Sequence, residues 1–249
     1  MGTSQGSAGH GLARTLSKLG VCSRAEAWRR IEAGRVQVNG VVCRDPERRI
    51  RPGKDRVEMD GAKAEASAKV YLMLNKPRGL VTTAADEQGR KTVFDCLQEV
   101  RVPHLVAVGR LDRASEGLLL LTNDTAWAAS ITAPESRIEK VYHVQVDAVV
   151  GPEVLDRMKA GVEEGGELLA VQGASVLRSG GKTSWMEVIL EEGRNRHIRR
   201  MLQVLGLEVL RLIRIRVGRV ELGALAKGAY RKLSTQEVEG LRARTSPHS

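Results

Sequence analysis

The chain has 249 residues, 42% of them apolar and 28% charged, which excludes a disordered or fibrous protein and predicts one large domain or a large and a small one. The net charge of +10 is concentrated, because residues 11–61 carry 12 Lys and Arg against 7 Asp and Glu, and residues 193–219 carry 8 Arg against one Glu. We therefore expect two regions that bind a polyanion. We expect neither a membrane span nor a secretory signal, because no apolar stretch is long enough for either.

The first predicted body is small and basic. Leucines at positions 12, 16 and 19 recur at helical spacing, and Gly20 ends that helix. Ser23 and Glu26 form a capping box that begins a second helix, which Gly34 ends. Short strands follow around the hairpin turn Asn39-Gly40, and another is expected at 56–59.

Two segments of this body, LARTLSKLGVCSRAEA and GRVQVNG, carry a resemblance to a known family. They make residues 12–61 similar to the alpha-L RNA-binding domain. The resemblance implies contacts with RNA, which we assign to polar side chains of the second helix and the hairpin: Arg24, Arg29, Arg35 and Asn39. Residues 1–11 are expected to be a flexible tip, and 62–68 (AKAEASA), which lack large apolar groups, a linker.

The second body is expected over 69–243, with a tail at 244–249. Strands are predicted at 70–75, 117–122, 140–146, 168–177, 185–190 and after 209, and helices at 92–97, 152–160 and 195–205. Strand outnumbers helix, so the sequence predicts an α+β fold around a mixed or antiparallel sheet.

The segment GRLDRASEGLLLLTND places Asp112 in an irregular stretch just before a strongly apolar strand. Arg110 and Arg113 bracket this carboxylate. From spacing alone, an aspartate between arginines is more typical of a structural ion pair than of a catalytic group.

Together with LNKPRGLVTT, KVYHVQV and EGRNRHIRRM, in this order, that segment resembles the RNA pseudouridine synthases, in the RsuA/RluB branch. The resemblance implies that uridine is isomerised to its C-glycoside without cofactor or metal. It implies that Asp112 is the essential aspartate, acting as a nucleophile or through a transient glycal, and that Arg199 is its partner. It also assigns Arg110 and Lys140 to RNA binding and Tyr142 to stacking on the base, although periodicity alone makes Tyr142 a core residue.

An Asp112 carboxylate inside a closed cleft needs a cation. Desolvation raises a carboxyl pKa by up to about 3 to 5 units, and a neighbouring arginine lowers it by about 1 to 3. Ile198, Met201 and Leu202 share one face of the predicted helix, which leaves its arginines off the core. At the start of that helix we expect basic side chains to meet an anion, either phosphate or Asp112: Arg194, Arg196, Arg199 and Arg200.

The substrate expected from this branch is ribosomal RNA or a pre-ribosomal particle, with the large subunit first (RluB-like) and the small subunit second (RsuA-like). A non-catalytic rRNA-binding or assembly factor is the alternative from another class. A glycosidase that uses Asp112 and Glu116 is disfavoured, because Gly117 and the leucines after it favour a strand over a helix that would align the two acids. His197 replaces a usual Gln and is expected to keep its hydrogen bond.

Scattered cysteines, Cys22, Cys43 and Cys96, without a CxxC pattern, favour a cytoplasmic protein without metal. We expect a monomer.

Overall fold

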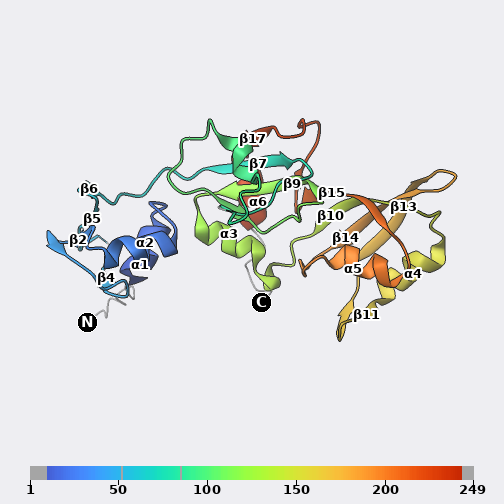
Figure 1. Cartoon of the computed structure of the whole chain (residues 1–249), viewed down its shortest axis with the longest axis horizontal. Helices are drawn as coiled ribbons and strands as arrows, with labels where there is room; N and C mark the ends of the chain where they lie inside the picture. The colour runs from blue at the N-terminus through green and yellow to red at the C-terminus, as the bar shows by residue number, and fades with distance from the viewer. Residues whose placement is uncertain (1–9, 52, 85, 243–249) are drawn as a thin grey trace, which may run out of the picture. The chain divides into compact units, whose positions relative to one another are not determined.

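The computed structural model describes residues 10–51, 53–84 and 86–242, so most of the predicted tip and the whole predicted tail lie outside the described residues. The chain divides into two compact units (Figure 1). The first comprises the described residues up to Val70 together with 101–106 and 122–126, and the second comprises the remainder. No helix in the described ranges is long and apolar enough to cross a membrane.

The first unit has the predicted two helices and small sheet. Helix α1 spans Leu12–Lys18, and α2 spans Arg24–Glu32 and begins where Ser23 Oγ accepts from Glu26 N at 3.0 Å. Strands β2 (Val36–Val38), β3 (Val41–Val42), β5 (Val57–Met59) and β6 (Ala62–Lys63) form one sheet, and β1 (His10–Gly11) pairs with β4 (Arg49–Ile50). Strand β6 falls inside the stretch that was expected to be a linker.

The second unit is built on a nine-stranded mixed sheet in the order β13-β14-β10-β15-β9-β7-β17. These strands span Gly173–Ser179, Ser184–Leu190, Lys140–Val146, Val209–Val217, Glu116–Thr122, Tyr71–Lys76 and Tyr230–Lys232. Two further strands extend it: β16 (Val220–Glu221) pairs with β15, and β8 (Val106–Val108) pairs with β9. Strands β13, β14, β10 and β15 are antiparallel neighbours, whereas β15 runs parallel to β9. The α+β prediction is confirmed.

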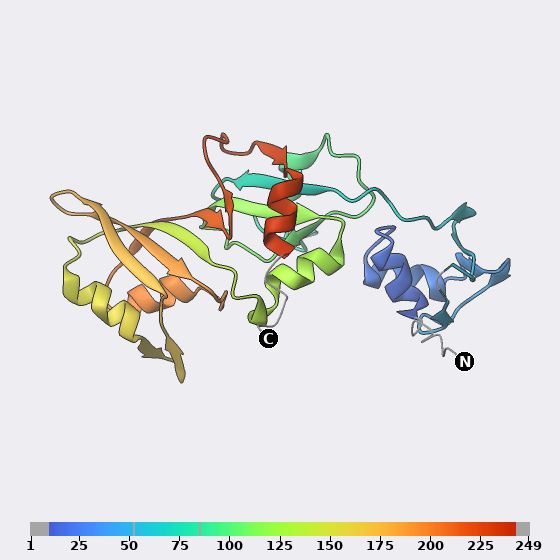
Figure 2. The same ribbon diagram turned by 180° about the vertical axis from the view of Figure 1, so that it is seen from behind.

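Helices cover this sheet in two groups. Helices α4 (Pro152–Ala160) and α5 (His197–Val204) lie on the same side of β13, β14 and β10 (Figures 1 and 2). Helices α3 (Thr125–Thr132) and α6 (Thr235–Arg242) pack on β9, and Trp127 Nε1 donates to Val238 O at 3.2 Å. The core there combines Leu118 and Leu120 with Trp127.

Several predicted elements differ from those observed. The expected helix at 92–97 is a 3-10 turn, η1 (Val93–Leu97), and a second such turn, η2, spans Pro134–Ser136. The single strand expected at 168–177 is divided between β13 and β12 (Glu167–Leu169), which pairs instead with β11 (Val162–Glu164). Helix α3 was not predicted, because TAWAASIT has no charged face to reveal its period.

Gly117 fixes the closest approach between β9 and β15. Its φ is +100°, and a Cβ built there would lie 2.2 Å from the carbonyl oxygen of Arg214. Only glycine satisfies both the backbone conformation and this contact. The parallel pairing therefore brings the start of β9, immediately after Asp112, against the middle of β15.

Candidate active site

The loop that carries Asp112 is held by its backbone from several other elements. Each of its five consecutive carbonyl groups accepts a hydrogen bond from outside the loop: Leu111 from Thr82 Oγ1 (2.8 Å), Asp112 and Ser115 from Lys76 Nζ (3.2 and 2.8 Å), Arg113 from Gly79 N (2.7 Å) and Ala114 from Arg199 Nη2 (3.2 Å). The donors come from the segment that begins with β7 and from α5. The backbone position of Asp112 is therefore fixed before any substrate binds.

Lys76, at the end of β7, is the central anchor of this loop. Its side chain is fully buried, and its ammonium group also donates to Pro77 O at 3.1 Å. Burial lowers the pKa of Lys76 to about 8, against the opposing pull of the Asp112 and Glu116 charges. Sequence reasoning missed this residue. The available signal was a lysine that ends an apolar strand and precedes a proline.

Glu116 holds the far end of the loop. It is 3% exposed, and both of its oxygens accept from Arg211 at 3.0 Å, while Lys227 Nζ lies 2.6 Å from Oε2. Burial alone would raise the pKa of Glu116, but hydrogen bonds from Arg211 and Lys227 outweigh it and lower the pKa. This carboxylate is thus occupied as a structural ion pair, in keeping with the disfavoured glycosidase interpretation.

The guanidinium group that forms a salt bridge with the Asp112 carboxylate is that of Arg196, whereas Arg199, the expected partner, binds the Asp112 loop through its backbone. Arg196 Nη1 lies 3.8 Å from Asp112 Oδ2. Arg196 occupies the N-cap of α5 with a left-handed backbone (φ 48°), which directs it differently from the helical residues that follow. The Asp112 side chain is 36% exposed among the described residues, which is more open to solvent than the closed cleft that was expected.

Arg199 instead braces two elements. Besides Ala114 O, its guanidinium group donates to Val209 O, at 3.2 Å in both cases, and so joins α5 to the Asp112 loop and to the start of β15. Burial lowers the pKa of Arg199, with a further contribution from the charge of Arg196, while the charge of Asp112 opposes the change. Arg199 therefore acts on Asp112 electrostatically and through the backbone, without a salt bridge between the described side chains.

Tyr142 and Lys140 lie on β10. Tyr142 is 9% exposed, opposite Arg214 of β15, and among the described residues its hydroxyl makes no hydrogen bond and its ring pairs with no other aromatic ring. Lys140 Nζ donates to Glu191 O at 2.7 Å. Burial, aided by the charge of Arg214, lowers the pKa of Lys140 to about 8.

The remaining arginines expected near the site differ in how they are engaged. Arg110 is exposed, whereas Arg194 donates to Leu168 O at 2.8 Å and pairs with Glu192. Arg200 is held by two carboxylates of the β11 and β12 hairpin, Glu164 and Glu167. Of this group, Arg110 is therefore the one most open to a ligand.

His197, which is expected to keep the hydrogen bond of a usual Gln, begins α5. Its side chain is 2% exposed, and neither ring nitrogen makes a hydrogen bond of normal length to a described residue. Nδ1 lies 3.7 Å from Glu192 Oε1. Burial lowers the pKa of His197, which favours the neutral ring.

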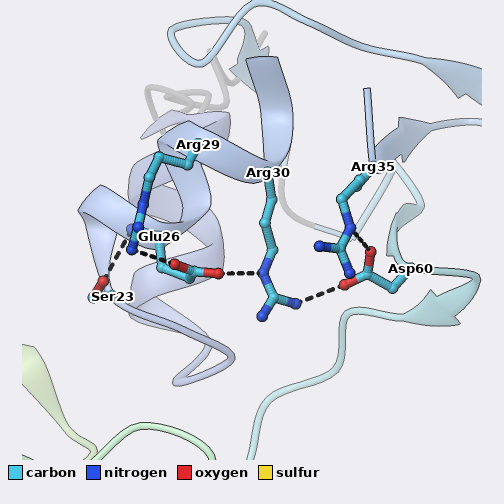
Figure 3. A network of polar contacts seen from close by, with 6 residues as sticks. All are labelled: Ser23, Glu26, Arg29, Arg30, Arg35 and Asp60. Atoms are coloured by element: carbon cyan, nitrogen blue, oxygen red, sulfur yellow. Dashed lines mark hydrogen bonds and ion pairs between the residues drawn. The ribbon is translucent and has the colours of Figure 1, made fainter. Parts of the chain in front are cut away.

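In the first unit, the predicted RNA-binding side chains belong to ion-pair networks. Arg30 joins Glu26 to Asp60 at 2.6 Å on each side, Asp60 also binds Arg35, and Glu26 also binds Arg29 (Figure 3). Arg24 pairs with Glu47, and Asn39 bridges Asp55 and the backbone of Arg56. Arg29 remains 75% exposed and Arg35 56%, so both present charge to solvent in fixed positions.

No group of three or more possible metal ligands occurs among the residues that the structure describes. What the site offers is an anchored carboxylate, guanidinium groups and an aromatic ring.

Comparison with known proteins assigns this arrangement. Residues 70–204 match the RNA pseudouridylate synthase family, and residues 11–57 match the S4 domain, an RNA-binding module. The first match spans more than half of the chain. The chain belongs to the RNA pseudouridylate synthase family. It is therefore an isomerase that acts on RNA, and the resemblance of residues 12–61 to an RNA-binding domain is confirmed.

Three relatives show how far the similarity extends. The ribosomal large subunit pseudouridine synthase B of Bacillus subtilis is 36% identical over 234 residues, covering 93% of this synthase and 95% of that protein. The protein of the same name from Xanthomonas campestris is 37% identical over 246 residues, covering 93% of this chain and 49% of its own length. A crystal structure of a pseudouridylate synthase superimposes with a TM-score of 0.66 at 27% identity and covers 93% of this chain and 99% of that one.

Proposed function

We propose that this synthase converts a uridine of large-subunit ribosomal RNA into pseudouridine, in free RNA or in a pre-ribosomal particle in the cytoplasm. Support for the large subunit comes from the Bacillus subtilis relative, whose name specifies that substrate and whose sequence aligns along nearly its full length. The net charge of +10 suits a polyanionic substrate.

The reaction breaks the bond between N1 of the base and C1′ of the sugar and forms one between C5 and C1′. C5 loses a proton, N1 gains one, and no electrons are exchanged with a cofactor. In our proposal the Asp112 carboxylate acts at the sugar, as a nucleophile at C1′ or as the partner of a transient glycal. The observation that carries this role is the loop itself, because five anchored carbonyl groups hold the backbone that presents the carboxylate.

Around Asp112 we assign separate tasks to its neighbours. Arg196, 3.8 Å from the carboxylate, is proposed to stabilise its charge, and Arg199 to position the loop. The unpaired ring of Tyr142 is proposed to stack on the flipped base, which has left its helix at a cost of a few kcal/mol. Contacts along the RNA offset that cost: Arg110, Lys140, Arg194, Arg200, Arg24, Arg29, Arg35 and Asn39.

The test uses large- and small-subunit rRNA, both as transcripts and in unmodified pre-ribosomal particles, incubated with the full chain, followed by mapping of pseudouridine. We expect a new site in the large-subunit RNA, and we expect Asp112→Asn to abolish it while RNA affinity changes less than about twofold. Asp156→Asn, which alters an exposed carboxylate on α4, is the matched control and should be fully active.

Modification of small-subunit RNA alone would contradict the proposed substrate. Binding without modification of either RNA would contradict the isomerase activity and favour a binding factor. Residual activity of Asp112→Asn equal to that of the control would remove Asp112 from the mechanism.

A further inference from the structure

The strands β13, β14, β10 and β15 have one covered and one open face. On the covered face Val144, Met186 and Val188 have no exposed surface, and α4 and α5 lie on one side of these strands (Figures 1 and 2). Cross-strand partners on the other face are all half-buried or exposed: His143, Gln145, Trp185, Glu187, Arg211, Ile213, Ser175 and Arg178. Two helices thus back a four-stranded antiparallel sheet whose other face meets solvent.

A row of cationic and aromatic groups crosses this open face. Arg178, Trp185, Gln145 and Arg211 are successive cross-strand partners on the four strands. The guanidinium carbons of Arg178 and Arg211 lie 5.4 and 5.6 Å from the centroid of the Trp185 ring. Such distances are those of cation–π pairs, so the three side chains hold one another in place on the sheet.

This row carries an excess of positive charge. The Glu116 carboxylate binds both Arg211 and Lys227, and the Lys227 side chain is 61% exposed. Arg178 is exposed and forms no salt bridge with a described residue. Arg211 and Lys227 therefore share the Glu116 carboxylate and Arg178 has none, while another carboxylate of this face, Glu187, lies beside His143. A protein partner would need acidic groups to match it, whereas a nucleic acid provides phosphates at regular intervals.

A cavity of about 320 Å³ lies on the same face, beside the row. Its lining combines an apolar wall with hydrogen-bond donors and with two carboxylates, and it includes His143, Ile215, Arg216, Glu187 and Glu221. This size is at the lower end of small-molecule sites, and this composition suits the edge of a base.

We infer that this open face, opposite the face on which Tyr142 lies, binds a single-stranded segment of the RNA. Unpaired bases stack on aromatic rings and on guanidinium planes, both of which the row offers, and the arginines and Lys227 supply donors to phosphates. A four-stranded antiparallel sheet backed by two helices is also the architecture on which other RNA-binding modules use their open face. The inference rests on the proposed function only in taking RNA as the polyanion.

The test measures binding of the full chain to a fluorescently labelled 12-nucleotide oligoadenylate as a function of salt. This probe has no uridine, so the result does not depend on isomerisation. Arg178→Gln should weaken binding about fivefold at 0.1 M salt and make the slope of log affinity against log salt shallower by about 0.7, the value for one phosphate contact on a single strand. Arg157→Gln, an exposed arginine of α4 on the covered side, is the matched control and should change neither.

A second measurement locates the contact. Ultraviolet cross-linking to the same probe should label the tryptic peptide 183–194, which contains Trp185, and Trp185→Ala should abolish that label. Equal affinity and equal salt slope for Arg178→Gln and Arg157→Gln would overturn the inference. Cross-links confined to other peptides would also overturn the inference. Either result would favour a protein partner for the open face. Failure of the rRNA modification test with these binding effects intact would overturn the proposed function alone.

Discussion

Lys76 Nζ donates to the backbone carbonyl oxygen of Asp112 at 3.2 Å, so the residue with the candidate catalytic carboxylate is held by its main chain and its side chain stays free. The same ammonium group binds Pro77 and Ser115 and is fully buried. A buried charge is tolerated only when hydrogen bonds replace its hydration, and here three carbonyl groups do so. The geometry of the Asp112 loop therefore depends on a residue with no exposed surface.

Replacing Lys76 by methionine should destabilise the protein and nearly abolish isomerisation. The change keeps the length of the side chain but leaves buried carbonyl groups unpaired, at about 1 to 3 kcal/mol for each group that water does not reach. Thermal denaturation and single-turnover kinetics measure the two effects. Lys159→Met, at an exposed lysine of α4, is the control, and equal behaviour of the two variants would remove Lys76 from the support of the loop.

Lys76 should also make stability depend on pH. Its pKa is lowered from 10.5 to about 8 in the folded chain, so between these values the unfolded state binds more protons and the free energy of unfolding rises with pH. The contribution of this group is at most about 3 kcal/mol, and it is constant below about pH 7. Urea unfolding between pH 7 and 10 should show this rise in the wild type and a smaller rise in Lys76→Met. Lys140 is present in both proteins, so its contribution to the pH dependence cancels in the comparison. Parallel curves of unfolding free energy against pH for the two proteins would refute the prediction.

Substitutions of Arg196 and Arg199 should separate charge stabilisation from loop positioning. Arg196 is 51% exposed and contacts the Asp112 carboxylate, so Arg196→Gln should lower the rate of isomerisation about tenfold or more with little change in stability. Arg199→Gln removes two hydrogen bonds in a half-buried site and should lower stability by about 1 to 3 kcal/mol as well as the rate. Single-turnover rates and urea unfolding of both variants test this prediction. If Arg196→Gln lowered stability and Arg199→Gln did not, the roles assigned to the two arginines would be reversed.

Gly117→Ala should prevent the close pairing of β9 with β15. The new Cβ would lie 2.2 Å from Arg214 O, and the φ of +100° is unfavourable for alanine. Both effects predict a loss of more than about 3 kcal/mol or failure to fold. Gly181→Ala, in the β13 to β14 hairpin with no atom within 4 Å of its Cβ, should change stability by less than about 0.5 kcal/mol. Similar denaturation curves for the two variants would disprove the argument.

The order of elements and the family followed from the sequence because both depend on local patterns. The cap at Ser23, the hairpin turn after Val38 and the apolar run of β9 all act within a few residues. The four motif blocks needed only their order along the chain. Helix α3 was missed for the same reason, because its alanine-rich sequence carries no local period.

Which side chain reaches Asp112 was decided by the tertiary structure alone. Arg196 and Arg199 are equivalent cations in the sequence, 84 and 87 residues from Asp112. Arg196 faces the carboxylate because its backbone is left-handed at the start of α5. Arg199 faces the backbone because it also contacts β15. Lys76 likewise becomes an anchor only when β7 and the Asp112 loop are packed together. Contacts over such separations depend on how strands and helices pack, and a local pattern, such as the lysine before a proline at position 76, marks a residue without showing its partner.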